Sequence, residues 1–307
     1  MPRRAPVTSA TGFVPLAMAF LCTMLGWRMR EADGQRKGFS MPITGRARLF
    51  AIIGDPVGVV RSPEWWNAAF ARAGLDAVFL PVEVAGGDLP VAWRGLTRLR
   101  NLDGIVLTMP HKQAVVPLLD GLGPMARLTG AVNTVRRRVD GGWEGEMFDG
   151  EGFVAGLRAA GHEPAGMRAL QVGCGGAGRA IAFALARAGV ASLALSDTAP
   201  GRAGALAEAA GEAFPDCAVA AGLADPAGYD LIVNATPLGL RPGDVLAVEP
   251  GRLSAGQVVA DVIPNPERTP LLDAAAVAGC DTVSGRAMFE GQARLAAAYL
   301  GFVGLGG

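Results

Sequence analysis

Lysine is nearly absent from this sequence, so the lysines that remain are candidates for chemistry. Among 28 lysine and arginine residues, only Lys37 and Lys112 are lysines. On a solvated surface the two residue types are largely interchangeable, but only lysine carries a small ammonium group that readily gives up its proton. Lys112 follows a predicted strand that ends near Thr108, and open α/β sheets bind ligands at the C-terminal ends of their strands. Lys112 is therefore a candidate for proton transfer.

Asp149 is a candidate partner for Lys112. It lies in Gly145-Glu-Met-Phe-Asp149-Gly150, at a predicted junction between two domains. A lysine and an aspartate that are paired in a cleft can relay a proton while a hydride moves to or from a nicotinamide ring. The alternative is an ordinary surface ion pair, which contributes about 0–1 kcal/mol to stability. The scarcity of lysine argues against that alternative for Lys112.

A glycine pattern predicts a nucleotide-binding loop. Gly173, Gly175 and Gly178 form Gly-x-Gly-x-x-Gly between a predicted strand and a predicted helix. The first glycine permits a tight turn, the second lets the backbone approach a pyrophosphate, and the third lets helix and strand pack closely. The phosphates would bind at the N-terminus of the helix, so Gly176 and Ala177 belong to the same predicted cofactor site. A tight turn that binds no ligand is the alternative.

Asp197 bears on which cofactor this loop would bind. It ends the next predicted strand, where a carboxylate can accept hydrogen bonds from the adenosine ribose and would repel a 2′-phosphate. NAD is therefore favoured over NADP, although Arg202 could reach a phosphate and keeps NADP possible. S-adenosylmethionine is a rival cofactor, because methyltransferases also combine a glycine-rich loop with an acidic residue at the end of the second strand.

An alternation of strands and helices would position these residues. The first half of the chain predicts strands at 48–54, 77–82 and 104–108, and helices at 62–73, 89–99 and 112–120. The second half predicts strands at 168–172, 192–196, 229–234 and 257–262, and helices at 152–160, 178–188, 202–214 and 287–300. Such alternation indicates parallel, doubly wound layers. The predicted fold class is α/β with two domains.

The composition is that of a globular protein without excess charge. The chain has 307 residues, 50% hydrophobic and 18% charged, with zero net charge. The high apolar content excludes disorder, and the balanced charge argues against a general nucleic-acid-binding protein. The four cysteines are scattered without a Cys-x-x-Cys pair, so neither a disulfide framework nor a zinc or other metal site is expected.

Residues 1–40 differ from the rest of the chain and predict a leader outside the fold. An apolar run from Gly12 to Trp27 is flanked by basic residues. It could be a signal peptide or membrane anchor, but it is short, contains Pro15 and lacks a small-residue cleavage site. The preferred interpretation is an upstream start codon, with translation beginning at Met41. We therefore expect a cytoplasmic protein without membrane association.

Several short motifs, in a fixed order, resemble the shikimate/quinate dehydrogenase family from about Leu49 to Leu300. They are Gly54-x-Pro56, Arg61-Ser62-Pro63, Thr108-x-Pro110-x-Lys112, Gly130-Ala-Val-Asn133-Thr134, Asp149-Gly150, the glycine loop, Asn234-Ala-Thr236-Pro-x-Gly239, Asp261 to Pro266, Thr269-Pro-Leu-Leu272 and Gly285-x-x-Met288-x-x-x-Gln292-Ala293. Each motif is short, but together they are highly specific.

The resemblance implies a division of labour along the chain. Residues 41–149 and 286–307 would form the substrate-binding domain, residues 150–285 would form a Rossmann dinucleotide-binding domain, and the C-terminal helix would return to the first domain. Lys112 and Asp149 match the catalytic pair. The implied substrate contacts are Ser62, Thr108, Asn133 and Gln292. The implied cofactor contacts beyond the loop are Asn234, Thr236, Val262 and Gly285.

Taken singly, three of these substrate residues have plainer interpretations. Ser62 could cap a helix, Asn133 could be a turn residue, and Gln292 could be a solvated helix position. The resemblance also has departures, because usually polar positions have become apolar or cannot donate a hydrogen bond. These positions are Val60, Val106, Met147, Phe148 and Pro264. A buried carboxylate that lacks such donors would bind worse, by about 0.5–3 kcal/mol for each lost bond.

The resemblance implies reversible, NAD(P)-dependent oxidation of a ring hydroxyl. The substrate would be shikimate, quinate or a related cyclic hydroxy acid, and the protein would act as a monomer or homodimer. The alternative is a paralogue that serves as a nucleotide-binding sensor or uses another substrate. The retained Lys112, Asp149, Asn133 and Gln292 argue against a sensor.

Overall fold

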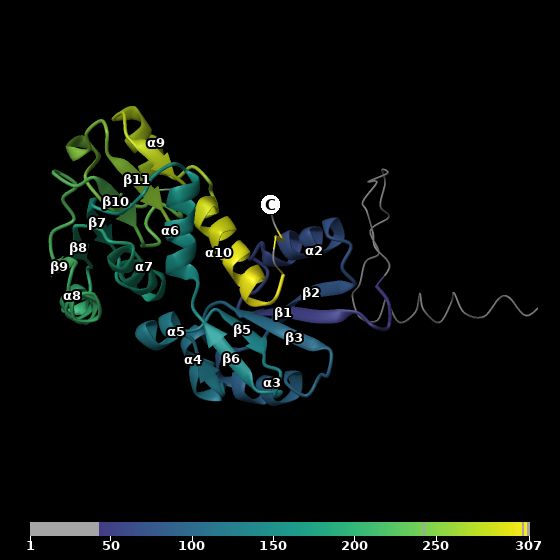
Figure 1. Ribbon diagram of the computed structural model, residues 1–307. Coiled ribbons are helices and arrows are strands. Elements are labelled where there is room, and N and C mark those ends of the chain that lie inside the picture. Colours follow the sequence, from purple (N-terminus) through teal and green to yellow (C-terminus); the bar gives the residue numbers. More distant parts are fainter. Residues whose placement is uncertain (1–42, 242, 303, 306–307) are drawn as a thin grey trace, which may run out of the picture. The chain divides into compact units, whose positions relative to one another are not determined.

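The computed structural model describes residues 43–241, 243–302 and 304–305 (Figure 1). The predicted leader, with Lys37 and Cys22, lies outside these residues. In the described part of the chain the strands form two six-stranded sheets, each combined with helices. The α/β class is therefore confirmed.

The first sheet has the strand order β2-β1-β3-β5-β6-β4. Its strands are β1 (Arg48–Gly54), β2 (Ala77–Glu83), β3 (Leu102–Leu107), β4 (Gly121–Leu122), β5 (Thr134–Arg137) and β6 (Trp143–Glu146). The helices between them are α2 (Ser62–Arg72), α3 (Leu89–Leu96), α4 (His111–Ala114) and α5 (Pro124–Thr129), with short 3-10 turns η1 (Gly86–Asp88) and η2 (Val116–Leu118).

Two predictions for this half of the chain are wrong. The sheet is not wholly parallel, because β5 runs antiparallel to both β3 and β6. Strands β5 and β6 form a hairpin through the Asp140-Gly141 turn. Each of them is too short to show a clear hydrophobic period. The predicted helix over 112–120 also ends early, at Ala114. Pro117 follows, and proline cannot donate the backbone hydrogen bond that continues a helix.

The second sheet is parallel throughout and has the order β12-β11-β10-β7-β8-β9. Its strands are β7 (Arg168–Val172), β8 (Ser192–Ser196), β9 (Ala218–Ala221), β10 (Leu231–Asn234), β11 (Val258–Asp261) and β12 (Asp281–Val283). The accompanying elements are α7 (Gly176–Arg187), α8 (Arg202–Ala213), η3 (Pro250–Arg252) and α9 (Pro270–Val277). The order reverses between β7 and β10, which is the switch point where doubly wound sheets bind nucleotides.

Two glycine-bearing helices, α6 (Asp149–Ala159) and α10 (Gly285–Tyr299), pack backbone to backbone (Figure 1). A β-carbon on Gly152 would lie 2.6 Å from the backbone nitrogen of Gln292, and one on Gly156 would lie 2.7 Å from the carbonyl carbon of Ala287. Real β-carbons do not approach other atoms so closely, so only glycine permits this helix spacing.

The end of α10 packs against the first sheet. It joins an apolar cluster beside α2, here called the α2 cluster, whose buried members are Phe50, Ile52, Val57, Trp66, Ala69, Phe70, Phe79, Val106, Phe148, Ala296, Ala297 and Leu305. In this cluster Trp66 stacks on Phe79 with ring centroids 5.3 Å apart. Because Ala296 and Ala297 belong to α10, the predicted return of the C-terminal helix to the first half of the fold is confirmed.

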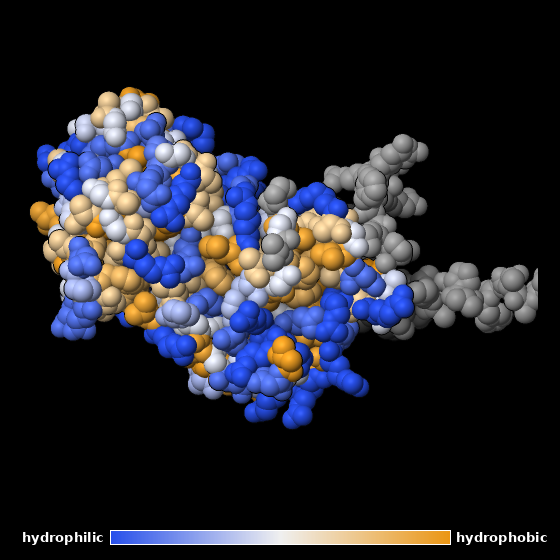
Figure 2. Space-filling view, in the orientation of Figure 1, coloured by the Kyte–Doolittle hydropathy of each residue, from blue (hydrophilic) through white to orange (hydrophobic). Residues whose placement is uncertain are grey.

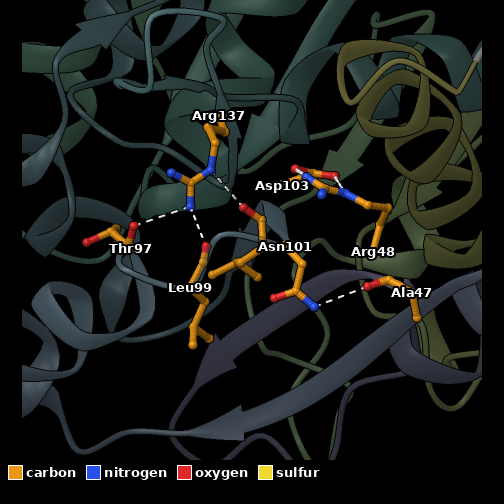
Figure 3. A network of polar contacts seen from close by, with 8 residues as sticks. Ala47, Arg48, Thr97, Leu99, Asn101, Asp103 and Arg137 are labelled. Carbon is orange, nitrogen blue, oxygen red and sulfur yellow. Dashed lines mark hydrogen bonds and ion pairs between the residues drawn. The ribbon is translucent and has the colours of Figure 1, made fainter. Parts of the chain in front are cut away.

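A polar network holds the antiparallel strand β5 in the first sheet (Figure 3). Arg137 donates hydrogen bonds to the carbonyl oxygens of Leu102 (2.9 Å), Leu99 (2.7 Å) and Thr97 (3.2 Å). The neighbouring Arg48 pairs with Asp103. The Arg137 guanidinium thus binds carbonyl oxygens at the start of β3 and in the loop before it. These contacts hold β5 beside β3, the strand with which it pairs.

The surface mixes hydrophilic and apolar residues on the face shown in Figure 2. Within the described ranges, every helix is too short or too polar to cross a lipid bilayer.

Replacing Gly156 by alanine should destabilise the fold, because the added methyl group meets the backbone of α10. We expect a loss of about 1–3 kcal/mol in the free energy of unfolding, measured by urea denaturation. The matched control is Gly211→Ala in α8, where a β-carbon meets nothing within 4 Å. That change should stabilise the protein by about 0.4–1 kcal/mol, because it restricts the unfolded chain. Equal effects of the two substitutions would show that helix contact is not what Gly156 provides.

Candidate active site

Lys112, Asp149 and Asn133 form one hydrogen-bonded trio. The Nζ atom of Lys112 lies 2.7 Å from Oδ2 of Asp149, and the Nδ2 atom of Asn133 donates to Oδ1 of Asp149 at 2.8 Å. Each carboxylate oxygen therefore has its own donor. The Asp149 side chain is 3% exposed and that of Lys112 is 26% exposed, so the lysine is the member of the pair that a solute can reach.

The elements that carry the three residues position their side chains. Asp149 is the first residue of α6, where the helix dipole favours a negative charge. Lys112 lies in α4, next to the fully buried His111, whose Nε2 is 2.7 Å from the carbonyl oxygen of Val84. The Oδ1 atom of Asn133 accepts the backbone N–H of Phe148 at 3.0 Å. The Asn133 amide thus bridges two consecutive residues at the start of α6.

Within the described residues, the three remaining predicted substrate residues form no side-chain hydrogen bond with the trio. Ser62 begins α2 and Thr108 follows β3, and both are half-buried. Gln292 lies on α10, where its backbone packs against Gly152, one turn after Asp149. In the described residues, the side chains of these three residues make no polar contact, so their donors and acceptors are available to a ligand.

Three of the five apolar departures belong to one packed region. Val106 and Phe148 are buried in the α2 cluster, and Val60 packs against it. Phe148 also meets Tyr299 of α10 edge to face, with centroids 5.4 Å apart. Met147 is buried elsewhere in the core and Pro264 is exposed. The side of the site next to α2 is therefore apolar where the family resemblance implies polar groups.

The glycine loop has the shape that a pyrophosphate requires. Gly173 has a φ of +100° and a β-carbon there would lie 2.7 Å from the backbone of Ala235, so the loop passes close to the end of β10. Gly175 and Gly176 are exposed, and nothing lies within 4 Å of a β-carbon placed on either. Gly178 packs tightly against the carbonyl of Gly173. Ala177 is half-buried between them.

The start of α7 leaves backbone donors for an anion. Gly175 caps the helix without a side-chain hydrogen bond, and the first N–H groups of a helix have no partner within it. Together with the open loop at Gly175 and Gly176, this fits a bound dinucleotide phosphate.

The Asp197 carboxylate forms hydrogen bonds within the protein, one of them to the glycine loop. Its Oδ2 accepts the N–H of Cys174 at 2.7 Å, and its Oδ1 accepts the N–H of Ala199 at 2.8 Å. Nη1 of Arg202 is 3.5 Å from the same Oδ1. Burial opposes ionisation, but these donors lower the pKa of Asp197. The residue therefore braces the loop as an anion, a role that the sequence did not indicate.

Asn234 and Thr236 also brace each other. Asn234 is fully buried. Its Nδ2 donates to the carbonyl of Leu238 (3.0 Å) and to Asp261 (3.1 Å), and its Oδ1 accepts the Thr236 hydroxyl at 2.6 Å. Burial raises the pKa of Asp261. These contacts hold the turn after β10, which lies beside the glycine loop. Asn234 therefore supports the backbone of that turn.

Val262 and Gly285 lie against each other at the start of α10. A β-carbon on Gly285 would lie 2.5 Å from the carbonyl oxygen of Val262. Gln292 is two turns further along the same helix, on the same face. One face of α10 thus extends from the end of β11 towards the start of α6.

Three polar residues that the sequence did not indicate support the site. Gln171, fully buried in β7, donates from Nε2 to the carbonyls of Gly173 (2.9 Å) and Gly178 (2.8 Å). Glu146 accepts the N–H of Ala126 at 2.7 Å, and burial raises its pKa. Arg179 contacts the end of α5. A polar residue within an apolar strand was the available signal for Gln171.

The candidate site holds a lysine–carboxylate pair, and the glycine loop lies at the switch point of the second sheet. A protonated Lys112 can donate a proton to a ligand oxygen, and Asp149 stabilises its charge without leaving the core. Residues with free polar groups lie on neighbouring elements. The arrangement suits proton transfer coupled to hydride transfer.

Comparisons with known proteins identify relatives of this chain. A family model described as the shikimate dehydrogenase substrate binding domain matches residues 52–135. The chain is 42% identical over 254 residues to the shikimate dehydrogenase (NADP(+)) of Rubrobacter xylanophilus, which covers 80% of this chain and 88% of that protein.

Solved structures show the same two-domain fold. The shikimate 5-dehydrogenase of Listeria monocytogenes, in complex with shikimate and NAD, matches with a TM-score of 0.78 and 32% identity, covering 84% of this chain and 92% of that one. The 5-ketofructose reductase of Gluconobacter sp. strain CHM43, in its ligand-free form, matches with a TM-score of 0.78 and 33% identity, covering 84% and 94%. The chain therefore belongs to the shikimate dehydrogenase family of oxidoreductases, which act on CH–OH groups with NAD or NADP.

Proposed function

We propose that this protein oxidises and reduces a ring hydroxyl of shikimate, quinate or a related cyclic hydroxy acid, with Lys112 and Asp149 as its proton-transfer pair. The observation that carries the proposal is the trio itself. The ammonium of Lys112, whose side chain is 26% exposed, lies 2.7 Å from a buried carboxylate, and Asn133 holds the other carboxylate oxygen. The similarity to a shikimate dehydrogenase over most of the chain supports the same reaction class.

In this proposal each polar group has one task. When bound, the nicotinamide ring supplies or accepts the hydride. In reduction, the Lys112 ammonium donates a proton to the substrate oxygen; in oxidation, neutral Lys112 takes that proton back. Asp149 holds Lys112 and stabilises its charge, and Asn133 keeps Asp149 oriented. Ser62, Thr108 and Gln292 bind the remaining polar groups of the substrate.

The two sheets divide the work. We assign substrate binding to residues 41–149 with 286–307, and dinucleotide binding to residues 150–285. The glycine loop and the end of β10 support the second assignment, since both lie at the switch point of the parallel sheet. We further propose that the enzyme is cytoplasmic and acts as a monomer or homodimer.

For the cofactor we favour NAD, and NADP remains the alternative. The anionic Asp197 at the end of β8 supports NAD because it would repel a 2′-phosphate. Arg202, 3.5 Å from Asp197, and the NADP(+) in the name of the Rubrobacter relative support the alternative. The solved Listeria relative was crystallised with NAD.

A second candidate is reduction of a ketone without a carboxylate. The apolar side formed by Val60, Val106 and Phe148 favours it, and one structural relative is a 5-ketofructose reductase. A panel of shikimate, quinate and 5-ketofructose with each nicotinamide cofactor separates the two candidates. Tight nucleotide binding with no turnover on any substrate would instead support the sensor interpretation.

Replacing Lys112 by methionine should abolish most turnover, because no other residue of the trio can carry the proton to the substrate. We expect kcat to fall by about 100- to 10,000-fold, followed through the absorbance of reduced cofactor. The kcat of the Lys112→Arg variant should fall as well, since a guanidinium does not release its proton. The matched control is Gln113→Met, an exposed neighbour on α4, which should retain turnover. Full activity in the Lys112→Met variant would refute the assigned mechanism.

Replacing Asp197 by asparagine should weaken the preference for NAD, because the repulsive charge disappears while one acceptor oxygen remains. We expect the ratio of kcat/KM for NAD to that for NADP to fall by about tenfold, or about 1.4 kcal/mol. The control is the same substitution at the exposed Asp216, which should leave the ratio unchanged. An unchanged ratio in the Asp197→Asn variant would mean that this carboxylate does not select the cofactor.

A further inference from the structure

Arg179 joins the helix of the nucleotide loop to the first half of the fold. It lies in the first turn of α7, and its backbone N–H donates to the carbonyl of Gly175 in the loop at 2.7 Å. Its Nε donates to the carbonyl oxygen of Thr129 at 3.1 Å, and its Nη2 donates to that of Leu128 at 3.2 Å. One residue therefore contacts both the glycine loop and the C-terminus of α5.

This contact is suited to the end of a helix. The last carbonyl groups of α5 have no partner within the helix, and a cation there also meets the negative end of the helix dipole. The guanidinium lies over the ring of Phe183, one turn further along α7, at 5.1 Å from its centroid. Two nitrogen atoms of the Arg179 guanidinium thus donate to α5, and one face of the guanidinium packs on Phe183. The side chain is therefore directed at the backbone of α5.

The segment after α5 leads directly to the trio. The N–H of Val132 donates to the carbonyl of Lys112 at 2.8 Å, and the N–H of Asn133 donates to the carbonyl of Glu146 at 3.1 Å. The side chain of Asn133 then holds Asp149. Only the short stretch from Thr129 to Asn133 separates the carbonyls that Arg179 contacts from the residues that orient the proton-transfer pair.

The first sheet holds the other end of α5. Oε1 of Glu146 in β6 accepts the N–H of Ala126, in the first turn of α5, at 2.7 Å. Strand β6 of the first sheet therefore holds the start of α5. Helix α7, which accompanies the second sheet, holds its end. Asn133 lies four residues beyond Thr129, the end of α5 that Arg179 contacts.

We propose that Arg179 is a positioning residue that couples the nucleotide loop to the placement of Asn133 and Lys112. Nucleotide bound at the loop fixes the first turn of α7, and Arg179 transmits this order to α5 and to the trio. The inference deepens the proposed function and rests on it for the identity of the ligand. Its test includes a measurement that does not need turnover.

The first experiment is amide hydrogen exchange on the full chain, with and without NAD and with and without NADP. In the wild type, the better-bound nucleotide should slow exchange at Val132 and Asn133, because local opening becomes rarer when the segment is ordered. In Arg179→Met the nucleotide should still bind, with Kd changed by less than about threefold by calorimetry, but the slowing at these two amides should be lost.

The second experiment measures kinetics on the substrate that the wild type uses best. Misplacement of the trio should lower kcat in Arg179→Met by about 10- to 100-fold, with little change in KM for the nucleotide, and should alter the pH profile of kcat. Arg179→Lys should recover part of kcat, since an ammonium can still donate to these carbonyls. The matched control is Arg127→Met, an exposed residue in the last turn of α5, which also removes a cation there and should keep wild-type kcat and protection.

The outcomes separate the two proposals. Nucleotide protection in the wild type without turnover on any substrate rejects the proposed function and leaves the coupling intact. Turnover with equal kcat and equal protection in wild type and Arg179→Met overturns the coupling. Absence of binding by either nucleotide overturns both. If Arg179→Met fails to fold, as judged by circular dichroism, the Arg179→Lys variant decides by the same comparison of protection and kcat.

Discussion

The side chain of Asp149 is 3% exposed, and the surrounding fold depends on compensating the charge of its carboxylate. A carboxylate removed from water costs several kcal/mol unless donors replace the lost solvent. Lys112 from α4 and Asn133 from the turn before β5 supply those donors, and the dipole at the N-terminus of α6 also favours the negative charge. Three separate elements must therefore meet at one point, and the first sheet and α6 are arranged so that they do.

Close packing of two helices provides the frame for this meeting. Gly152 and Gly156 let α10 approach α6 backbone to backbone. Gln292 of α10 thereby packs against Gly152, which lies one helical turn after Asp149 on α6. The far end of α10 is buried in the α2 cluster with Phe148. The same helix therefore contributes to the apolar side of the site and to its polar side.

Around the second sheet, the polar side chains of Gln171, Asp197 and Asn234 hold the backbone of the glycine loop and of the adjoining turn. Gln171 ties together the two ends of the loop, Asp197 holds Cys174, and Asn234 shapes the adjoining turn. Buried carbonyl and N–H groups need hydrogen-bond partners, and these side chains provide partners for two carbonyls and one N–H group of the loop. Cys174, within the loop, is buried, and burial together with Asp197 raises its pKa to about 11, so its thiol stays protonated near neutral pH.

The sequence alone determined the residue types at the site and the long elements. Lys112 stood out because arginine replaces lysine almost everywhere else, and the strand–glycine loop–helix pattern at 168–188 depends only on local spacing. The tertiary structure decided the rest. The antiparallel β5 and β6 are too short to show periodicity, and their pairing depends on contacts such as those of Arg137. The partners of Asp197 and Arg179 lie on other elements, so no spacing along the chain indicates them. Hydrogen bonds between residues distant in sequence are set by sheet order and helix packing, which local patterns do not encode.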